Sequence, residues 1–175
     1  MAFNIQNMKS QLQLGGARPT LFEVNITNTA GIGGLKLEKT PFLVHATTLP
    51  ESSVGSFELP YMGRKIQHAG DRTFQPWRVS VFNDEDFSIR RGLETWIDRI
   101  QGNVSNIRTV TDYKGQATVT QFTKNGGVSR VYTFVNIFPT TIEPITLDWN
   151  TTDSVESFDV TFRYDYWELS ADAFK

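Results

Sequence analysis

Along much of this 175-residue chain, apolar and polar side chains alternate residue by residue. A period of two is typical of β-strands that are buried on one face only. In residues 20–27, for example, Phe22, Val24 and Ile26 share one face and polar residues occupy the other. The expected strands lie at residues 20–27, 42–48, 50–60, 61–66, 75–83, 116–123, 128–137, 145–149 and 154–166. The alternation therefore predicts a mainly β protein.

One amphipathic helix is expected at about residues 85–101. Its apolar positions recur with helical spacing and fall on one face: Ile89, Leu93, Trp96, Ile97 and Ile100. Asp84 is the candidate N-cap, and Gly102 is the candidate stop at the C-terminal end.

The connections between the expected strands indicate an antiparallel arrangement. Lys124-Asn125-Gly126-Gly127 is typical of a β-hairpin turn. The chain shows no strand–helix–strand rhythm and no internal repeat. We therefore predict a single domain, 1–175, folded as an antiparallel β-barrel or sandwich with one flanking α-helix. It would include an N-terminal arm or short helix (1–16), a glycine-rich loop (28–41) and a C-terminal arm (169–175).

Residues suited to catalysis or metal binding are sparse. The chain has no cysteine, which excludes disulfides, thiolate metal sites and a cysteine nucleophile. The two histidines, His45 and His68, lie in no catalytic motif and are expected to be structural. The acidic run 84–86 is better explained by helix capping than by a metal site. The glycines of 31–34 are not followed by the helix that a phosphate-binding loop requires. No catalytic residue, cofactor or metal is predicted.

The charge balance bears on possible partners. The 17 Lys and Arg against 19 Asp and Glu give a formal net charge of −2. Proteins that bind nucleic acid tightly usually have a strong basic excess, so tight binding is not expected, although nucleic acid could pass along such a surface. No stretch approaches about 18 consecutive apolar residues, so neither a transmembrane helix nor a stable membrane association is expected. The first residues also lack the features of a secretory signal.

Large aromatic residues are concentrated in two segments, 57–83 and 139–168. The chain contains 13 Phe, 5 Tyr and 4 Trp. Some of these side chains must form the core, and the others would suit an assembly interface, where aromatic residues are enriched. The composition leaves both interpretations open.

Several separate motifs follow one another along the chain. They are Ala17-Arg18-Pro19-Thr20-Leu21-Phe22, Pro60-Tyr61-Met62-Gly63-Arg64-Lys65-Ile66, Ala69-Gly70-Asp71-Arg72-Thr73-Phe74, Trp77-Arg78-Val79-Ser80-Val81, Asn83-Asp84-Glu85, Phe138-Pro139-Thr140, Leu147-Asp148-Trp149, Phe158-Asp159-Val160-Thr161 and Asp165-Tyr166-Trp167-Glu168. These motifs resemble the tail tube proteins of contractile-tailed bacteriophages. Together they span about residues 17–168 in the order of that family. Several motifs in one order are far more specific than any one of them.

The resemblance implies a structural subunit that forms hexameric rings, which stack into a hollow tube with no enzymatic activity. Its implied partners are further copies of the chain, a tail sheath protein, baseplate and tail terminator proteins, a tape measure protein in the lumen, and DNA in transit. The implied location is the virion tail, assembled in the host cytoplasm.

Two sets of residues are candidates for roles in such an assembly. Ring stacking would use the 28–41 loop, the proline-bounded segment 50–65 and the terminal arms. The candidate interface residues are Phe57, Leu59, Tyr61, Arg64, Lys65 and Arg72. A lumen that lets phosphates pass should be polar and without Lys or Arg. The candidate lumen-facing residues are Gln116, Thr118 and Thr120.

Other functions remain open at this stage. The tube could belong to a tailocin or to a type VI-like secretion device. The aromatic residues on a β scaffold could instead form a monomeric module that binds a carbohydrate or a protein, which a glycan array or a pull-down would detect. A hydrolase using Asp71 and Asp84 is a further alternative, and activity that survives the replacement of both carboxylates by Asn would dispose of it.

Overall fold

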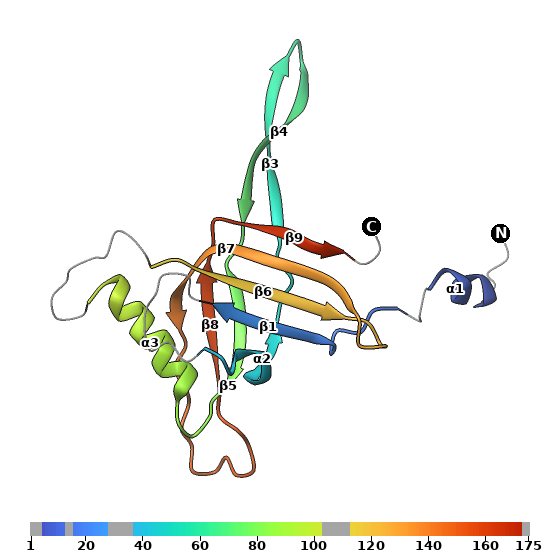
Figure 1. Ribbon diagram of the computed structural model, residues 1–175. Coiled ribbons are helices and arrows are strands. Elements are labelled where there is room, and N and C mark those ends of the chain that lie inside the picture. The colour runs from blue at the N-terminus through green and yellow to red at the C-terminus, as the bar shows by residue number, and fades with distance from the viewer. Residues whose placement is uncertain (1–4, 13–15, 28–36, 103–112, 173–175) are drawn as a thin grey trace.

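The computed structural model describes residues 5–12, 16–27, 37–102 and 113–172. One seven-stranded antiparallel sheet is folded into two halves, with a helix at one side and a long two-stranded hairpin projecting from one end (Figure 1). The elements in chain order are α1 (Ile5–Gln11), β1 (Phe22–Thr27), α2 (Thr40–Leu43), β2 (Val44–Thr47), β3 (Ser52–Tyr61), β4 (Arg64–Phe74), β5 (Trp77–Phe82), α3 (Ser88–Ile100), β6 (Gly115–Phe122), β7 (Val128–Ile142), β8 (Ser157–Arg163) and β9 (Tyr166–Asp172). The expected mainly β, antiparallel fold with a flanking helix is confirmed.

The long strand β7 belongs to both halves of the sheet. Its first part pairs with β6 and β9, and together with β1 these strands form the first sheet half. From Phe138 onward β7 pairs with β8, and the second sheet half continues through β5 to β2. Asn136 has a φ of 59°, which asparagine tolerates better than most residues, and the register shifts between Pro139 and Thr141. Because bulges bend a strand, β7 can pass from one half to the other.

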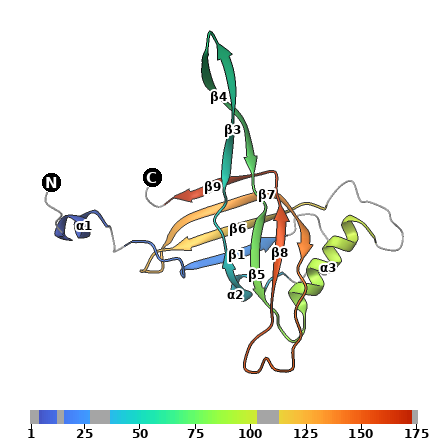
Figure 2. The ribbon, with the colours of Figure 1, turned by 180° about the vertical axis from the view of Figure 1, so that it is seen from behind.

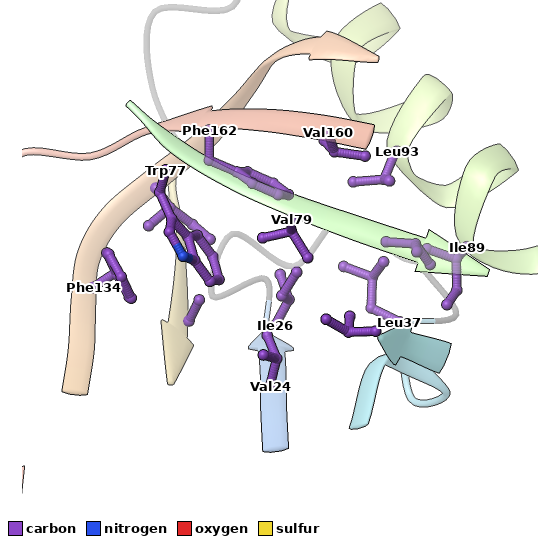
Figure 3. Packing of buried hydrophobic residues seen from close by; sticks show 14 of the residues in the cluster. Val24, Ile26, Leu37, Trp77, Val79, Ile89, Leu93, Phe134, Val160 and Phe162 are labelled. Carbon is purple, nitrogen blue, oxygen red and sulfur yellow. The ribbon is translucent and has the colours of Figure 1, made fainter. Parts of the chain in front are cut away.

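The hydrophobic core lies between the two sheet halves and α3 (Figure 3). The first sheet half contributes the alternating inward residues expected from the sequence, including Val24, Ile26 and Phe134, all at most 4% exposed. Trp77 and Phe162 face them from the second half. Burying side chains of this size removes a large apolar area from water, which is the main stabilising contribution in such a fold.

The helix α3 confirms the predicted apolar stripe but not the predicted N-cap. Ile89, Leu93 and Trp96 are buried against the sheet. The helix begins at Ser88, after Phe87, which has a left-handed φ of 52° and makes no side-chain capping bond. Asp84 lies three residues before this N-cap position, where one carboxylate oxygen accepts the N–H of Glu85 and the other pairs with Lys39, so it does not cap α3.

Several strand boundaries differ from those predicted. In the strand predicted at 42–48, only Val44–Thr47 are extended, because residues 42 and 43 are the end of the short helix α2. Pro41 favours the first turn of this helix. The strand predicted at 50–60 is β3, which runs from Ser52 to Tyr61. The strand predicted at 61–66 begins too early, since Met62 and Gly63 form the turn between β3 and β4 with positive φ angles, and residues 64–66 are the start of β4.

Two further strand predictions, near the C-terminus, are wrong. Residues 145–149 contain no strand. The single strand expected at 154–166 is divided, because β8 ends at Arg163 and β9 begins at Tyr166 on the other sheet half.

The segments expected at the chain ends and in the glycine-rich loop are described in part. Residues 5–11 form α1, all of whose side chains are exposed. Most of the 28–41 loop lies outside the described residues, and its described end holds the buried Leu37. The segment 169–175 starts inside β9, which continues to Asp172.

Candidate assembly surfaces

The β3–β4 hairpin carries all six residues that the sequence analysis assigned to assembly. It projects beyond both sheet halves, as seen from the front and from behind (Figures 1 and 2). Three of these residues lie on β3 and three on β4: Phe57, Leu59 and Tyr61, and Arg64, Lys65 and Arg72. The fold thus places the six on one projecting element, although not on one face of it.

One face of the hairpin is apolar and exposed. Residues directly opposite each other in an antiparallel pair point to the same side. The pairs on this face are Phe57 with His68, Leu59 with Ile66, and Tyr61 with Arg64. Leu59 and Ile66 are 51% and 47% exposed, and Phe57 stacks on His68 with ring centroids 5.4 Å apart. We call Phe57, Leu59, Tyr61 and Ile66 the apolar row; the isolated subunit leaves about half of it in contact with water.

The opposite face of the hairpin is polar. Lys65 Nζ lies 2.7 Å from Glu58 Oε2, and Gln67 Nε2 donates a hydrogen bond of 2.7 Å to Glu58 Oε1. Both contacts stabilise the charged form of Glu58 and so lower its pKa, the contact with Lys65 more than the hydrogen bond from Gln67. Arg72 lies nearer the body, beyond a register shift between the two strands. Lys65 and Arg72 therefore do not extend the apolar row.

The outer face of the first sheet half is mostly polar, although β7 contributes two valines to it. On β6, Gln116, Thr118 and Thr120 alternate with the buried Ala117 and Val119, so the three candidate lumen residues share this face. Directly opposite residues continue the face onto the neighbouring strands: Glu23, Asn25 and Thr27 on β1, Val131, Thr133 and Val135 on β7, and Tyr166, Glu168 and Ala171 on β9. Among these paired residues there is no lysine or arginine.

The first sheet half also has two outer edges, formed by β1 and β9. Among the described strands, β1 pairs with β6 and β9 pairs with β7, each on one side only. The N–H of Ile26 donates to Thr40 Oγ1 at 3.3 Å, so α2 covers the last part of the β1 edge. An edge strand presents backbone N–H and C=O groups that can pair with another chain.

The connection between β7 and β8, residues 143–156, forms a loop at the end of the molecule opposite the hairpin (Figures 1 and 2). It contains four carboxylates and no lysine or arginine, and we call it the acidic loop. Trp149 is 100% exposed and Leu147 is 78% exposed. The loop borders a hollow of about 530 Å³ lined by residues that include both of these side chains. Trp149 belongs to the aromatic-rich segment 139–168 that was expected to serve the core or an assembly interface, but residues 145–149 were expected to form a strand rather than an exposed loop.

Comparison with known proteins identifies the family. A family model described as phage tail tube protein matches residues 17–170. The chain belongs to the phage tail tube protein family. Tail tube protein gp19 of Enterobacteria phage T6 is 34% identical over 155 residues, which cover 87% of this chain and 91% of that relative. The resemblance stated from the sequence motifs is therefore confirmed.

Solved structures share the fold of this tail tube protein. A chain of the PVC sheath/tube terminator, from an extracellular contractile injection system in the extended state, has a TM-score of 0.66 at 16% identity and covers 86% of this chain and 94% of its own. A chain of the PVC sheath–tube complex in the extended state has a TM-score of 0.59 at 13% identity and covers 97% of this chain and 99% of its own. Both likenesses extend over almost the whole domain.

The candidate catalytic residues of this tail tube protein lie apart from one another. Asp71 is on the projecting hairpin, whereas Asp84 is in the body, 2.5 Å from Lys39 Nζ. His45 stacks on Phe82, with ring centroids 4.0 Å apart. Among the residues that the structure describes, no group of three His, Asp or Glu side chains could hold a metal ion. None of the described helices is long and apolar enough to cross a membrane.

Proposed function

We propose that this tail tube protein builds the inner tube of a contractile phage tail. Copies join edge to edge into hexameric rings, and the rings stack into a hollow conduit for DNA. The observation that carries the proposal is that one sheet half combines two outer edges with a polar face that lacks Lys and Arg.

Strand direction supports ring closure through this sheet half. Its four strands are antiparallel to one another in the order β1-β6-β7-β9. With an even number of alternating strands, β9 of one copy and β1 of a copy related by rotation also run antiparallel. Pairing between β9 and the part of the β1 edge that α2 leaves open continues the sheet and satisfies the backbone groups that it reaches. A head-to-tail contact of this kind makes a closed ring when its rotation closes.

The polar face of the sheet supports its role as the lumen wall. When the ring closes, this face lies on the concave side, because the buried residues of the same strands face α3 and the second sheet half. Thr118 and its neighbours offer short hydrogen-bonding side chains, and Glu23 and Glu168 offer negative charge. DNA phosphates bind Lys and Arg and are repelled by carboxylates, so DNA would pass along this wall without being retained.

The proposed partners follow from the position of a tube inside a contractile tail. We assign to this chain a surrounding sheath, a baseplate and a terminator at the two ends, a tape measure protein in the lumen during assembly, and a place in the virion tail after assembly in the host cytoplasm. The likeness to chains from a sheath–tube complex and a sheath/tube terminator supports the sheath and terminator. Ring stacking is assigned to the hairpin with Phe57, Leu59, Tyr61, Arg64, Lys65 and Arg72.

Site-directed cross-linking tests the ring. The chain has no native cysteine, so a double variant with Asn25→Cys on β1 and Glu168→Cys on β9 carries the only two thiols. A short bismaleimide should convert it into a ladder of species ending at the hexamer, with rings visible by electron microscopy. Each single-cysteine variant is the matched control and should remain uncross-linked. A monomer at high concentration, with or without a baseplate, would contradict the proposal and favour a ligand-binding module.

A further inference from the structure

The hairpin and the acidic loop leave opposite ends of the same strand pair. Trp77, where the chain enters β5 from the hairpin, pairs with Phe162 of β8. Phe82, at the other end of β5, pairs with Ser157, where the acidic loop enters β8. The two features therefore cannot meet within one subunit, and both views show them at opposite ends (Figures 1 and 2).

The hairpin end combines apolar area with positive charge. The apolar row leads along one face to Tyr61 and Arg64, which lie opposite each other beside the turn. Tyr61 is 62% exposed, and Met62 in the turn is 88% exposed. Lys65 is paired with Glu58, but no ion pair joins Arg64 to any residue that the structure describes. A contiguous exposed apolar surface of this kind marks an interaction site.

The acidic loop has the complementary properties. Ile145, Leu147, Trp149 and Val155 line the hollow together with Asp148 and Glu156. The Trp149 ring is fully exposed in the part of the subunit that the structure describes, and large aromatic side chains are the usual anchors of protein interfaces. The hollow therefore offers apolar contact and negative charge side by side, as the hairpin end offers apolar contact and positive charge.

We propose that the hairpin end of one copy docks into the hollow of the acidic loop on a second copy of this chain in the next ring. The apolar row packs against Leu147 and Trp149, and Arg64 lies toward Asp148. This inference rests on the proposed tube and names the surface that receives the stacking hairpin. Because the two surfaces lie at opposite ends of each subunit, the contact repeats head to tail and generates an open stack rather than a closed pair.

The charges also give the stack a direction. Two hairpin ends in contact would bring Arg64 against Arg64, and two acidic loops would bring Asp148 against Asp148. Only the head-to-tail contact places opposite charges together. Repulsion in the wrong arrangements is a recognised source of specificity in assembly, so rings would add to the stack in one orientation.

Truncation of Trp149 tests this inference. The side chain is fully exposed, so Trp149→Ala should leave the subunit folded and the rings intact while raising the protein concentration needed for tube formation about tenfold or more. The matched control is Trp149→Phe, which keeps an aromatic ring and should stack nearly as the wild type does. Both are measured by sedimentation of tubes and by electron microscopy of rings and tubes.

A charge exchange and a cross-link give independent readouts. Arg64→Glu should weaken stacking, and adding Asp148→Arg should restore it. Since Asp148 Oδ1 also accepts the N–H of Asn150 at 3.0 Å, a second measurement uses a double variant that keeps Trp149: Met62→Cys in the hairpin turn and Thr151→Cys, which also lines the hollow. A bismaleimide should link it between rings, whereas neither single variant should react with a second copy.

The outcomes separate this inference from the proposed function. Rings that stack normally with Trp149→Ala, or dimers cross-linked through Met62→Cys alone, would overturn the docking inference and leave the ring intact. A wild-type protein that forms no rings would overturn the proposed function and the docking inference together.

Discussion

The indole of Trp77 stacks on the ring of Phe134, with centroids 4.3 Å apart, and so joins the two sheet halves across the core. Trp77 is 1% exposed, and its Nε1 donates a 3.0 Å hydrogen bond to the carbonyl of Thr48 at the base of the hairpin. One side chain therefore links both halves of the sheet and the connection that leads to β3.

Trp77→Ala should lower the free energy of unfolding by about 3–5 kcal/mol, because it opens a large cavity between the sheet halves. Urea unfolding followed by circular dichroism measures the change. Trp149→Ala is the matched control: its indole is fully exposed, so stability should stay within about 0.5 kcal/mol of the wild type. Equal effects of the two substitutions would contradict this description of the core.

A second prediction concerns Gly115, at the start of β6. A β-carbon there would lie 2.8 Å from the carbonyl oxygen of Thr27 and 2.8 Å from Cη2 of Trp96. Trp96 cannot move freely, because its Nε1 donates to the carbonyl of Tyr113. Gly115→Ala should therefore lower the free energy of unfolding by about 1–3 kcal/mol, as overpacking does. Gly127→Ala is the control, because a β-carbon at Gly127 would lie 3.4 Å from the nearest atom beyond its chain neighbours. Thermal unfolding should show a much smaller loss of stability for this variant.

The core residues, and the face that Gln116, Thr118 and Thr120 share, were predictable because both depend on local alternation. Val24, Ile26, Ala117 and Val119 are buried as the period of two required, and the polar residues between them share the outer face. In α3 the spacing of Ile89 and its partners was likewise enough to find the buried side.

The structure differs from the prediction where contacts between residues distant in sequence determine the local conformation. The alternation continues unbroken through Tyr164 and Asp165, yet the strand divides there, because Lys114 and Asn136 hold the Asp165 carboxylate. Those partners are 51 and 29 residues away, and no local pattern reveals them. Similarly, α3 begins at Ser88 rather than directly after Asp84, whose carboxylate pairs with Lys39, 45 residues away. The acidic loop was not predicted, because its apolar residues Ile145, Leu147 and Trp149 alternate with polar ones as they would in a short strand.

The ion pair between Lys39 and Asp86 predicts a loss of stability in acid. The hydrogen bond from Lys39 and, to a smaller extent, the one from the backbone N–H of Ser88 lower the pKa of Asp86 from 3.8 to about 2. Since the folded-state pKa is the lower one, this contribution is present above about pH 4 and is lost as the pH falls toward 2. The thermal midpoints of the wild type and Asp86→Asn should therefore differ at neutral pH and converge near pH 2. Glu85→Gln, at an exposed neighbouring position, is the control, and parallel curves for Asp86→Asn would contradict the assignment.

The lumen assignment predicts that positive charge on the sheet face slows DNA. Virions carrying Gln116→Arg and Thr118→Arg should assemble tubes of normal length, because these side chains lie outside the core. DNA release should be slower, and the delay should shrink at high salt, since Arg–phosphate contacts weaken with ionic strength. Gln116→Glu with Thr118→Gln is the control of similar bulk. Release at the wild-type rate from the arginine variant would place the lumen on another face.

A substitution in the exposed apolar row of the hairpin should block assembly without unfolding the subunit. Leu59 lies in the middle of the apolar row and is half exposed in the subunit, so Leu59→Asp should leave the thermal midpoint nearly unchanged. In an assembly that buries the row, the same carboxylate would be removed from water without a partner, which is strongly unfavourable. Tubes should therefore be absent from electron micrographs of the purified variant, while a folded subunit persists. Ser56→Asp places the same charge on the same strand but on the opposite, polar face, and it should still assemble. Full tubes from Leu59→Asp would show that ring stacking does not bury the apolar row.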